Sequence, residues 1–176
     1  MATAALLDRA AGIRLAAFDV DGVLTDGSLY YSDAGEETKA FSTLDGHGLK
    51  LLMAEDVRVA LITARTSRLL EARARNLGID LVFQGCSDKA KVFRLLLADL
   101  GFDPQQTSYM GDDVVDLPTL RIAGLALTVP QAPAAVRRAA HHVTRRPGGR
   151  GAVREACELL LLARDRLGTA APGRGP

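Results

Sequence analysis

The chain has 176 residues, enough for one domain with a sizeable core, and a content of 48% hydrophobic and 24% charged residues is ordinary for a globular protein. A formal net charge of +1 excludes bulk positive charge as a basis for binding nucleic acid or a membrane surface. The first residues have no secretory signal pattern, and no apolar run approaches the ~20 residues of a bilayer span. Cys86 and Cys157 stand far apart without a metal-ligand spacing. We therefore expect free thiols in a cytoplasmic protein with no nucleic-acid or membrane partner.

Short apolar runs alternate with helical segments along the chain. The expected strands cover 15–19, 57–63, 79–83, 107–110, 125–128 and, at an edge, 141–144. The expected helices cover 67–78, 88–101, 117–122 and 151–166. This alternation predicts an α/β fold, a parallel sheet with helices on both faces. We expect an N-terminal extension over residues 1–12, a single domain over 13–166 and a disordered, Gly/Pro-rich tail over 167–176.

The segment 27–41 breaks the alternation. It contains two β-rich runs around the turn residues SDAG at 32–35, which predict a hairpin. Because this segment stands between the first strand and the helix after it, the hairpin should project from the carboxyl edge of the sheet. Leu29, Tyr30 and Phe41 are apolar, and an isolated two-stranded hairpin is only marginally stable. The hairpin is therefore expected to pack against other copies of the chain.

Polar side chains gather at the expected carboxyl ends of the strands. These residues are Asp19, Asp21, Thr63, Arg65, Lys89, Asp112, Asp113 and Asp116. In open α/β sheets, ligands bind at this edge, where the strand order reverses. Carboxylates, a hydroxyl and a lysine at one edge suit a phosphate held with Mg²⁺, which prefers carboxylate, water and phosphate oxygens.

The same residues resemble the motifs of the haloacid dehalogenase (HAD) superfamily of aspartate-nucleophile phosphotransferases: DVDGVLT, Thr63, Lys89 and GDDVVD. Within it, the segments DGVLTDG, DGHGLKLL, LITAR, FQGCSDK, GDDVVDLP and GGRGAVRE look like the 3-deoxy-D-manno-octulosonate (KDO) 8-phosphate phosphatases. The resemblance runs from about Ile13 to Leu162 without a large inserted cap. It implies a HAD-like Rossmannoid fold of the capless type, in which the 27–41 hairpin replaces the cap. It also implies Mg²⁺-dependent hydrolysis of KDO 8-phosphate in lipopolysaccharide precursor synthesis, by a homotetramer assembled through that hairpin.

The resemblance also assigns roles to individual residues. Asp19 would be the nucleophile that forms an aspartyl-phosphate, and Asp21 the general acid and base. Mg²⁺ would be bound by Asp19, the Asp21 backbone carbonyl and Asp112, and steadied by Asp113 or Asp116. Those two acids equally suit the N-terminus of the following helix. Thr63 and Lys89 would bind the transferring phosphoryl group.

Substrate recognition is expected from residues around this centre. The expected contacts are Asp21, Ser42, Thr43, Asp45, Gly46, Lys50, Arg65, Arg73 and Lys89. An arginine fork suits the carboxylate of a sugar acid. Related phosphatases of nine-carbon sugar acids tend to carry glutamate where this chain has Arg65, which favours the eight-carbon substrate. The basic, glycine-rich segment 145–155 either enters a neighbouring active site or forms a solvated face.

Three alternatives share part of this pattern. One is a phosphatase of a nine-carbon sugar-acid 9-phosphate. Another is a phospho-receiver domain, but an acid two residues after the nucleophile suits hydrolysis better than storage of a phosphate. The third is a non-catalytic assembly domain, which the complete set of catalytic residue types argues against. The sequence favours an active enzyme.

Overall fold

The computed structural model describes residues 3–170, and within them a six-stranded parallel sheet forms the centre of the chain. Its strands are β1 (Leu15–Phe18), β4 (Arg58–Ile62), β5 (Leu81–Phe83), β6 (Thr107–Met110), β7 (Leu125–Thr128) and β8 (His142–Val143). They lie in the order β5-β4-β1-β6-β7-β8, and every neighbouring pair is parallel. The predicted α/β fold, with its edge strand β8, is confirmed.

The strand order reverses between β1 and β6. From β1 the chain adds β4 and β5 on one side, and β6 then starts the other side with β7 and β8 after it. All four residues of β1 are buried, as are those of β6 and β7, which explains the uninterrupted apolar run of β1. The carboxyl ends of β1 and β6 therefore meet at the topological switch point, where α/β folds bind ligands.

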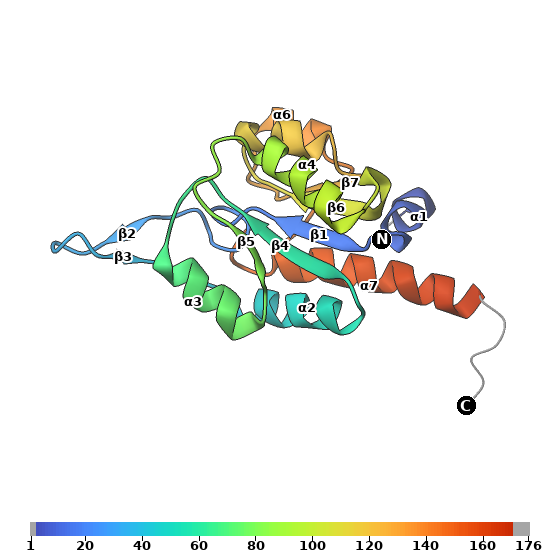
Figure 1. Cartoon of the computed structure of the whole chain (residues 1–176), viewed down its shortest axis with the longest axis horizontal. Helices are drawn as coiled ribbons and strands as arrows, with labels where there is room; N and C mark the ends of the chain where they lie inside the picture. Colours follow the sequence, from blue (N-terminus) through green and yellow to red (C-terminus); the bar gives the residue numbers. More distant parts are fainter. Residues whose placement is uncertain (1–2, 171–176) are drawn as a thin grey trace.

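Helices cover both faces of the sheet (Figure 1). One face carries α2 (Thr43–Ala54), α3 (Arg68–Leu77) and α7 (Ala152–Ala170), and the other α4 (Lys89–Leu100), α5 (Leu117–Leu120) and α6 (Ala134–Ala139). Two short 3₁₀ turns, η1 (Pro104–Gln106) and η2 (Val114–Asp116), precede β6 and α5. None of the helices within residues 3–170 combines the length and apolarity that crossing a bilayer requires.

Helices lie at both ends of the described chain. The N-terminal extension contains a helix, α1 (Ala4–Ala11), which packs on α7 and buries Leu7 and Ala10. At the other end, α7 continues to Ala170, so residues 167–170 are helical and the expected disordered tail was placed too early. The rest of that expected tail, residues 171–176, lies outside the described residues.

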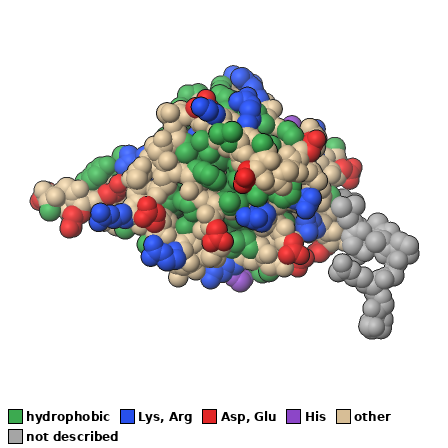
Figure 2. All heavy atoms as spheres, viewed as in Figure 1, with side chains coloured by type: hydrophobic (Ala, Val, Ile, Leu, Met, Phe, Trp, Pro, Cys, Tyr) green, Lys and Arg blue, Asp and Glu red, His purple; other side chains and the backbone are tan. Residues whose placement is uncertain are grey.

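The hairpin consists of β2 (Tyr30–Tyr31) and β3 (Glu37–Thr38), paired antiparallel, and projects from the sheet as a narrow arm (Figure 1). Gly35 has a φ of 78°, the left-handed conformation that the turn needs. Leu29, Tyr30 and Tyr31 are 47%, 49% and 59% exposed. Hydrophobic side chains on this arm are visible in Figure 2. The chain thus carries the predicted hairpin and no larger cap within the described residues.

Candidate active site

The chain leaves β1 directly into a polar turn. The Asp19 N–H still donates to the Met110 carbonyl of β6 (2.8 Å), which continues the sheet by one residue. The Asp19 carboxylate is buried, and its Oδ1 accepts a hydrogen bond from the Val20 N–H (2.7 Å). Gly22 follows with a φ of 90°, and a Cβ at this position would lie 2.1 Å from Asp112 Oδ2. Glycine is therefore required for the first loop to approach the loop after β6.

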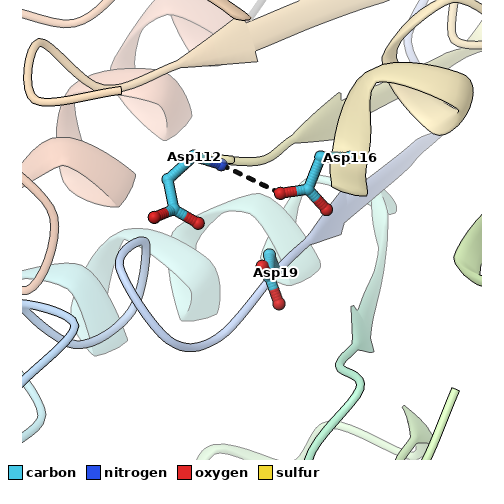
Figure 3. A group of neighbouring side chains, drawn as sticks. All are labelled: Asp19, Asp112 and Asp116. Atoms are coloured by element: carbon cyan, nitrogen blue, oxygen red, sulfur yellow. Dashed lines mark hydrogen bonds between the residues drawn. The ribbon is translucent and has the colours of Figure 1, made fainter. Parts of the chain in front are cut away.

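Asp116 links several parts of the site and is fully buried. Its Oδ1 accepts from the Lys89 Nζ and from the Tyr109 hydroxyl, both at 2.8 Å. Its Oδ2 accepts from the backbone N–H groups of Asp112 (3.1 Å) and Asp113 (3.2 Å), the first of which is drawn in Figure 3. Asp116 thereby fixes the loop that carries Asp112.

Lys89 is the cation of this cluster. Asp88 caps α4 by accepting from the Lys91 N–H (2.9 Å), which places Lys89 in the first turn of the helix. The Lys89 Nζ lies 2.7 Å from Asp19 Oδ2 and 2.8 Å from Asp116 Oδ1. Burial disfavours its charge, but the two carboxylates outweigh burial and raise the pKa of Lys89. Lys89 therefore stays protonated beside the nucleophile candidate.

The carboxylates of Asp19, Asp112 and Asp116 converge from the ends of β1 and β6 (Figure 3). One oxygen from each lies within 4.8 Å of the others. Burial, followed by repulsion from Asp116, raises the pKa of Asp19 to about 6. Burial, followed by repulsion from Asp19, raises the pKa of Asp112 to about 7. With Lys89 as the nearby cation, the cluster has more negative than positive charge, which suits a divalent cation with hard oxygen ligands.

A second group of polar residues faces this cluster from β4 and the hairpin. Thr63 is buried at the end of β4, where its Oγ1 accepts from the Arg65 N–H (3.2 Å). The Arg65 Nε lies 3.8 Å from Asp21 Oδ2. The Arg65 Nη2 donates to Glu37 Oε1 (3.1 Å) and to the Tyr31 hydroxyl (3.2 Å). Arg65 therefore runs from the acid–base candidate to the paired strands of the hairpin.

Two residues of this group, Glu37 and Lys39, were missed by the sequence analysis. The Lys39 Nζ bonds to Asp21 Oδ1 and lies 3.3 Å from Glu37 Oε1. A signal was present, because residues two apart on a strand share a face, and an acid and a base on one face of the hairpin suggest a common partner. The pattern alone does not tell which face turns toward the sheet.

Asp45 and Lys50 were predicted to contact substrate, and the structure places them elsewhere. The Asp45 carboxylate accepts from the backbone N–H groups of Gly151 (3.2 Å) and Arg154 (2.7 Å), so it caps the start of α7. Lys50 is exposed and lies seven residues after the start of α2, about 10 Å along the helix axis. Because α2 runs back from the carboxyl edge toward the start of β4, this position carries Lys50 away from the site.

Four further predicted recognition residues, Ser42, Thr43, Gly46 and Arg73, lie at or against the start of α2. Ser42 caps the helix, its Oγ accepting from the Asp45 N–H (3.3 Å). Arg73 on α3 donates from Nη2 to the Ser42 carbonyl (3.0 Å), and a Cβ at Gly46 would lie 2.2 Å from that nitrogen. Thr43 is exposed at the first helical position. These residues hold α2 against α3 beside the base of the hairpin.

Asp113 and the glycine-rich segment have local partners. Asp113 is exposed and caps η2, its Oδ1 accepting from the Val114 N–H (2.7 Å), so of the two acids left open it is Asp116 that joins the buried cluster. The Gly149 N–H donates to the Val23 carbonyl (2.9 Å), and a Cβ at Gly148 would lie 1.9 Å from the Gly22 carbonyl oxygen. The segment therefore packs against the first loop of its own chain.

Comparisons with known proteins agree with this geometry. Residues 78–154 match the haloacid dehalogenase-like hydrolase family. The 3-deoxy-D-manno-octulosonate 8-phosphate phosphatase KdsC of Yersinia pestis is 49% identical over 162 residues, which cover 92% of this chain and 87% of that protein. KdsC of Escherichia coli K12 is 44% identical over 165 residues, which cover 94% of this chain and 88% of that protein. The chain belongs to this phosphatase family.

Solved structures of KDO 8-phosphate phosphatases match nearly the whole chain. The 1.95 Å crystal structure from Yersinia pestis gives a TM-score of 0.92 at 47% identity, covering 95% of this chain and 90% of that one. A structure from Moraxella catarrhalis, in complex with a magnesium ion, a phosphate ion and KDO, gives 0.91 at 38% identity, covering 96% of this chain and 97% of that one. Membership of the KDO 8-phosphate phosphatase family sets aside the receiver-domain and assembly-domain alternatives.

Proposed function

We propose that this chain is a Mg²⁺-dependent phosphomonoesterase that hydrolyses KDO 8-phosphate to KDO and inorganic phosphate, for lipopolysaccharide precursor synthesis. The observation that carries the proposal is the Asp19–Lys89 pair at the switch point, with a second acid two residues later and Asp112 opposite. The similarity to phosphatases named for this substrate supports the choice of sugar acid.

The chain's oxygen donors fit the proposed magnesium ion. Each Asp116 oxygen accepts two hydrogen bonds, whereas each Asp19 oxygen has one polar partner and so keeps a lone pair for a cation. We assign the ion to Asp19, Asp112 and the Asp21 backbone carbonyl, with Asp116 orienting Asp112 from behind. When bound, the ion offsets the negative charge of the carboxylates and of the phosphoryl group.

In the first half-reaction, an ionised Asp19 oxygen attacks phosphorus and forms the aspartyl-phosphate while the P–O bond to the sugar breaks. Asp21 gives its proton to the departing sugar oxygen. Lys89 and Thr63 bind the phosphoryl oxygens. Because its Nζ also lies 2.7 Å from Asp19 Oδ2, Lys89 additionally offsets the repulsion between this carboxylate and the phosphoryl group.

In the second half-reaction, a water oxygen attacks the phosphorus of the aspartyl-phosphate. Asp21, now ionised, takes the proton of that water, and the bond between phosphorus and the Asp19 oxygen breaks. Inorganic phosphate leaves, Asp19 is again a free carboxylate, and Asp21 is again protonated. Asp19 and Asp21 need different environments for these two roles. Each has its own lysine partner, Lys89 for Asp19 and Lys39 for Asp21, which makes their environments different.

Recognition of the sugar acid is proposed for residues on the hairpin side of the centre. The Arg65 guanidinium, 38% exposed, extends outward from Asp21 and is suited to the substrate carboxylate. Ser42, Thr43, Gly46 and Arg73 are proposed to form the adjoining wall, where the start of α2 also offers backbone N–H groups to an anion.

We also propose that the enzyme is a homotetramer assembled through the hairpin. The exposed Leu29, Tyr30 and Tyr31 lie on an arm of two short strands, which is marginal on its own. Val114 and Val115, 51% and 61% exposed in the loop after β6, offer a second apolar surface at the same edge. A cytoplasmic location is proposed because Cys86 and Cys157 are buried free thiols, as suits a reducing compartment.

The test is phosphate release by the purified chain from three monoesters: KDO 8-phosphate, a nine-carbon sugar-acid 9-phosphate and p-nitrophenyl phosphate. We expect the highest kcat/KM for KDO 8-phosphate with Mg²⁺ present, and none of this activity in Asp19→Asn. A higher kcat/KM for the nine-carbon substrate, or no release from KDO 8-phosphate, would overturn the assignment.

A further inference from the structure

Lys39 is buried although it belongs to an exposed arm. Its side chain is 2% exposed, whereas the neighbouring hairpin residues Tyr30 and Tyr31 are about half exposed. Its Nζ bonds to Asp21 Oδ1 and lies 3.3 Å from Glu37 Oε1. A lysine is rarely buried without carboxylate partners, and here one partner is the proposed acid–base group. Lys39 therefore links the base of the hairpin directly to the reaction centre.

The two oxygens of Asp21 differ in their surroundings. Oδ1 is held by Lys39, whereas Oδ2 is buried without a hydrogen-bond partner in the described part of the chain. The Arg65 Nε, 3.8 Å away, is likewise buried without such a partner among those residues. A buried acceptor and a buried donor that face each other without a hydrogen bond both keep unused hydrogen-bonding capacity. Of the two Asp21 oxygens, Oδ2 is therefore the one that Lys39 leaves without a hydrogen bond.

Each reactive aspartate consequently has its own lysine from a different element. Lys89 at the start of α4 contacts Asp19 at 2.7 Å, and Lys39 at the end of the hairpin contacts Asp21. The nucleophile is therefore fixed by the core, whereas the acid–base group is fixed by the projecting arm.

We propose that Lys39 is a positioning residue for Asp21. It binds Oδ1, turns Oδ2 toward the leaving oxygen and the attacking water, and makes the orientation of the acid–base group depend on the packing of the hairpin. The inference rests on the proposed function, which gives Asp21 its role, and deepens it. Glu37 supports the arrangement because its Oε1 lies between Lys39 (3.3 Å) and Arg65 (3.1 Å).

The central experiment compares steady-state kinetics of wild type, Lys39→Met, Lys39→Arg and Lys91→Met. Lys91 is exposed on α4, so its variant is a matched removal of one lysine. We expect Lys39→Met to lower kcat at least ~10-fold while KM changes less than ~3-fold, because a misdirected acid affects the chemical step. Lys39→Arg should recover part of the lost kcat, and Lys91→Met should match wild type. A kcat of Lys39→Met within about 2-fold of wild type, or a loss that appears mainly in KM, would overturn the proposal.

A double-mutant cycle tests whether Lys39 acts through Asp21. In an Asp21→Asn background, Lys39→Met should cause little further loss, because the group that it positions is already gone. Full, multiplicative losses would mean that Lys39 contacts the substrate directly and would overturn the positioning role. Sedimentation of Lys39→Met should give the wild-type mass, and a loss of kcat together with a lower mass would assign Lys39 to hairpin folding instead.

The outcomes also separate this inference from the proposed function. If wild type fails to hydrolyse KDO 8-phosphate, the substrate assignment fails, and the same comparison is made with p-nitrophenyl phosphate. If wild type hydrolyses KDO 8-phosphate and Lys39→Met does so equally well, the function stands and the role of Lys39 fails.

Discussion

Gly22 lies so close to Asp112 that a Cβ on Gly22 would come within 2.1 Å of Asp112 Oδ2. The contact joins the first loop to the loop after β6, so the two loops fix each other's position across the switch point. The backbone of Gly22 also has a φ of 90°, which L side chains rarely adopt. Both this backbone conformation and the close contact with Asp112 are possible because glycine has no Cβ.

We predict that Gly22→Ala weakens Mg²⁺ binding and lowers kcat by more than ~10-fold, because the Asp112 carboxylate must leave its position to avoid the added Cβ. Gly78→Ala is the matched control: Gly78 has a φ of 79° but no atom within 4 Å of an added Cβ. It imposes the backbone strain without the clash. The measurements are the Mg²⁺ dependence of turnover and thermal unfolding, and equal effects of both variants on turnover would contradict the steric explanation.

Substituting the two reactive aspartates should separate their roles from folding. Asp19→Asn should lower turnover by at least ~1,000-fold, because an amide cannot attack phosphorus. Asp21→Asn should lower it by at least ~100-fold, because an amide neither protonates the leaving group nor activates water. Circular dichroism should show both variants folded. Near-normal turnover by either folded variant would rule out the mechanism.

The strand ends and the order of motifs along them were predictable because both are local features. An apolar run followed by acids identifies a buried strand that ends at a site, and parallel strands bring such ends to one edge. Asp45 shows the limit: its carboxylate caps α7 more than a hundred positions later in the chain, and no local pattern specifies that partner. Lys39, directly after β3, is similar: its two-residue spacing from Glu37 predicts a shared face but leaves open whether that face meets Asp21.

The same limit explains why the sequence did not predict α1 or the end of α7. α1 contains a short apolar face, Leu7 and Ala10, which is stable because α7 covers it. A helix of this length is marginal alone, so propensity could not identify it. Residues 167–170 continue α7 despite Gly168. Adding a residue to an existing helix costs less free energy than starting a new helix. In each case a contact or an existing helix overrides the local composition.

The pH dependence of stability should report the carboxylate cluster. The folded-state pKa values of about 6 for Asp19 and about 7 for Asp112 lie above the ordinary 3.8, so the folded protein binds these protons more tightly than the unfolded chain. Their stabilising contribution is complete below pH 3.8 and is lost as the pH rises through 6 and 7. Without a divalent cation, the melting temperature should therefore fall as the pH rises from about 4 to about 7 and then level off.

Asp112→Asn provides the comparison that isolates this effect from other titrating groups. The difference in melting temperature between the variant and wild type should grow as the pH rises through about 7, in favour of the variant. Saturating Mg²⁺ should reduce the fall in wild type, because the cation compensates the ionised carboxylates, and should do less for the variant. Parallel pH curves for the two metal-free proteins would show that Asp112 has no raised pKa.

Arg65→Ala should discriminate between substrates. If Arg65 binds the carboxylate of the sugar acid, the variant should lose roughly 1.5–3 kcal/mol of recognition, a factor of about 10 to 150 in kcat/KM for KDO 8-phosphate. The loss for p-nitrophenyl phosphate, which has no carboxylate, should be much smaller. Arg94→Ala, an exposed arginine on α4, serves as control. An equal loss with both substrates would place Arg65 at the phosphoryl group instead.

The last prediction concerns the packing of the hairpin against other copies of the chain. Leu29, Tyr30 and Tyr31 expose about half of their surface in the single chain, and burying them between copies is favourable by roughly 25 cal/mol per Å² of apolar area. Replacing Leu29 and Tyr30 by glutamate should therefore lower the mass in solution, measured by sedimentation equilibrium. Because Glu37 and Lys39 connect the same hairpin to Arg65 and Asp21, turnover of KDO 8-phosphate should fall together with the mass. A matched change at Leu95, which is 61% exposed on α4 away from the hairpin, should leave both unchanged. Wild-type protein that sediments as a fully active monomer at assay concentration would refute assembly through the hairpin.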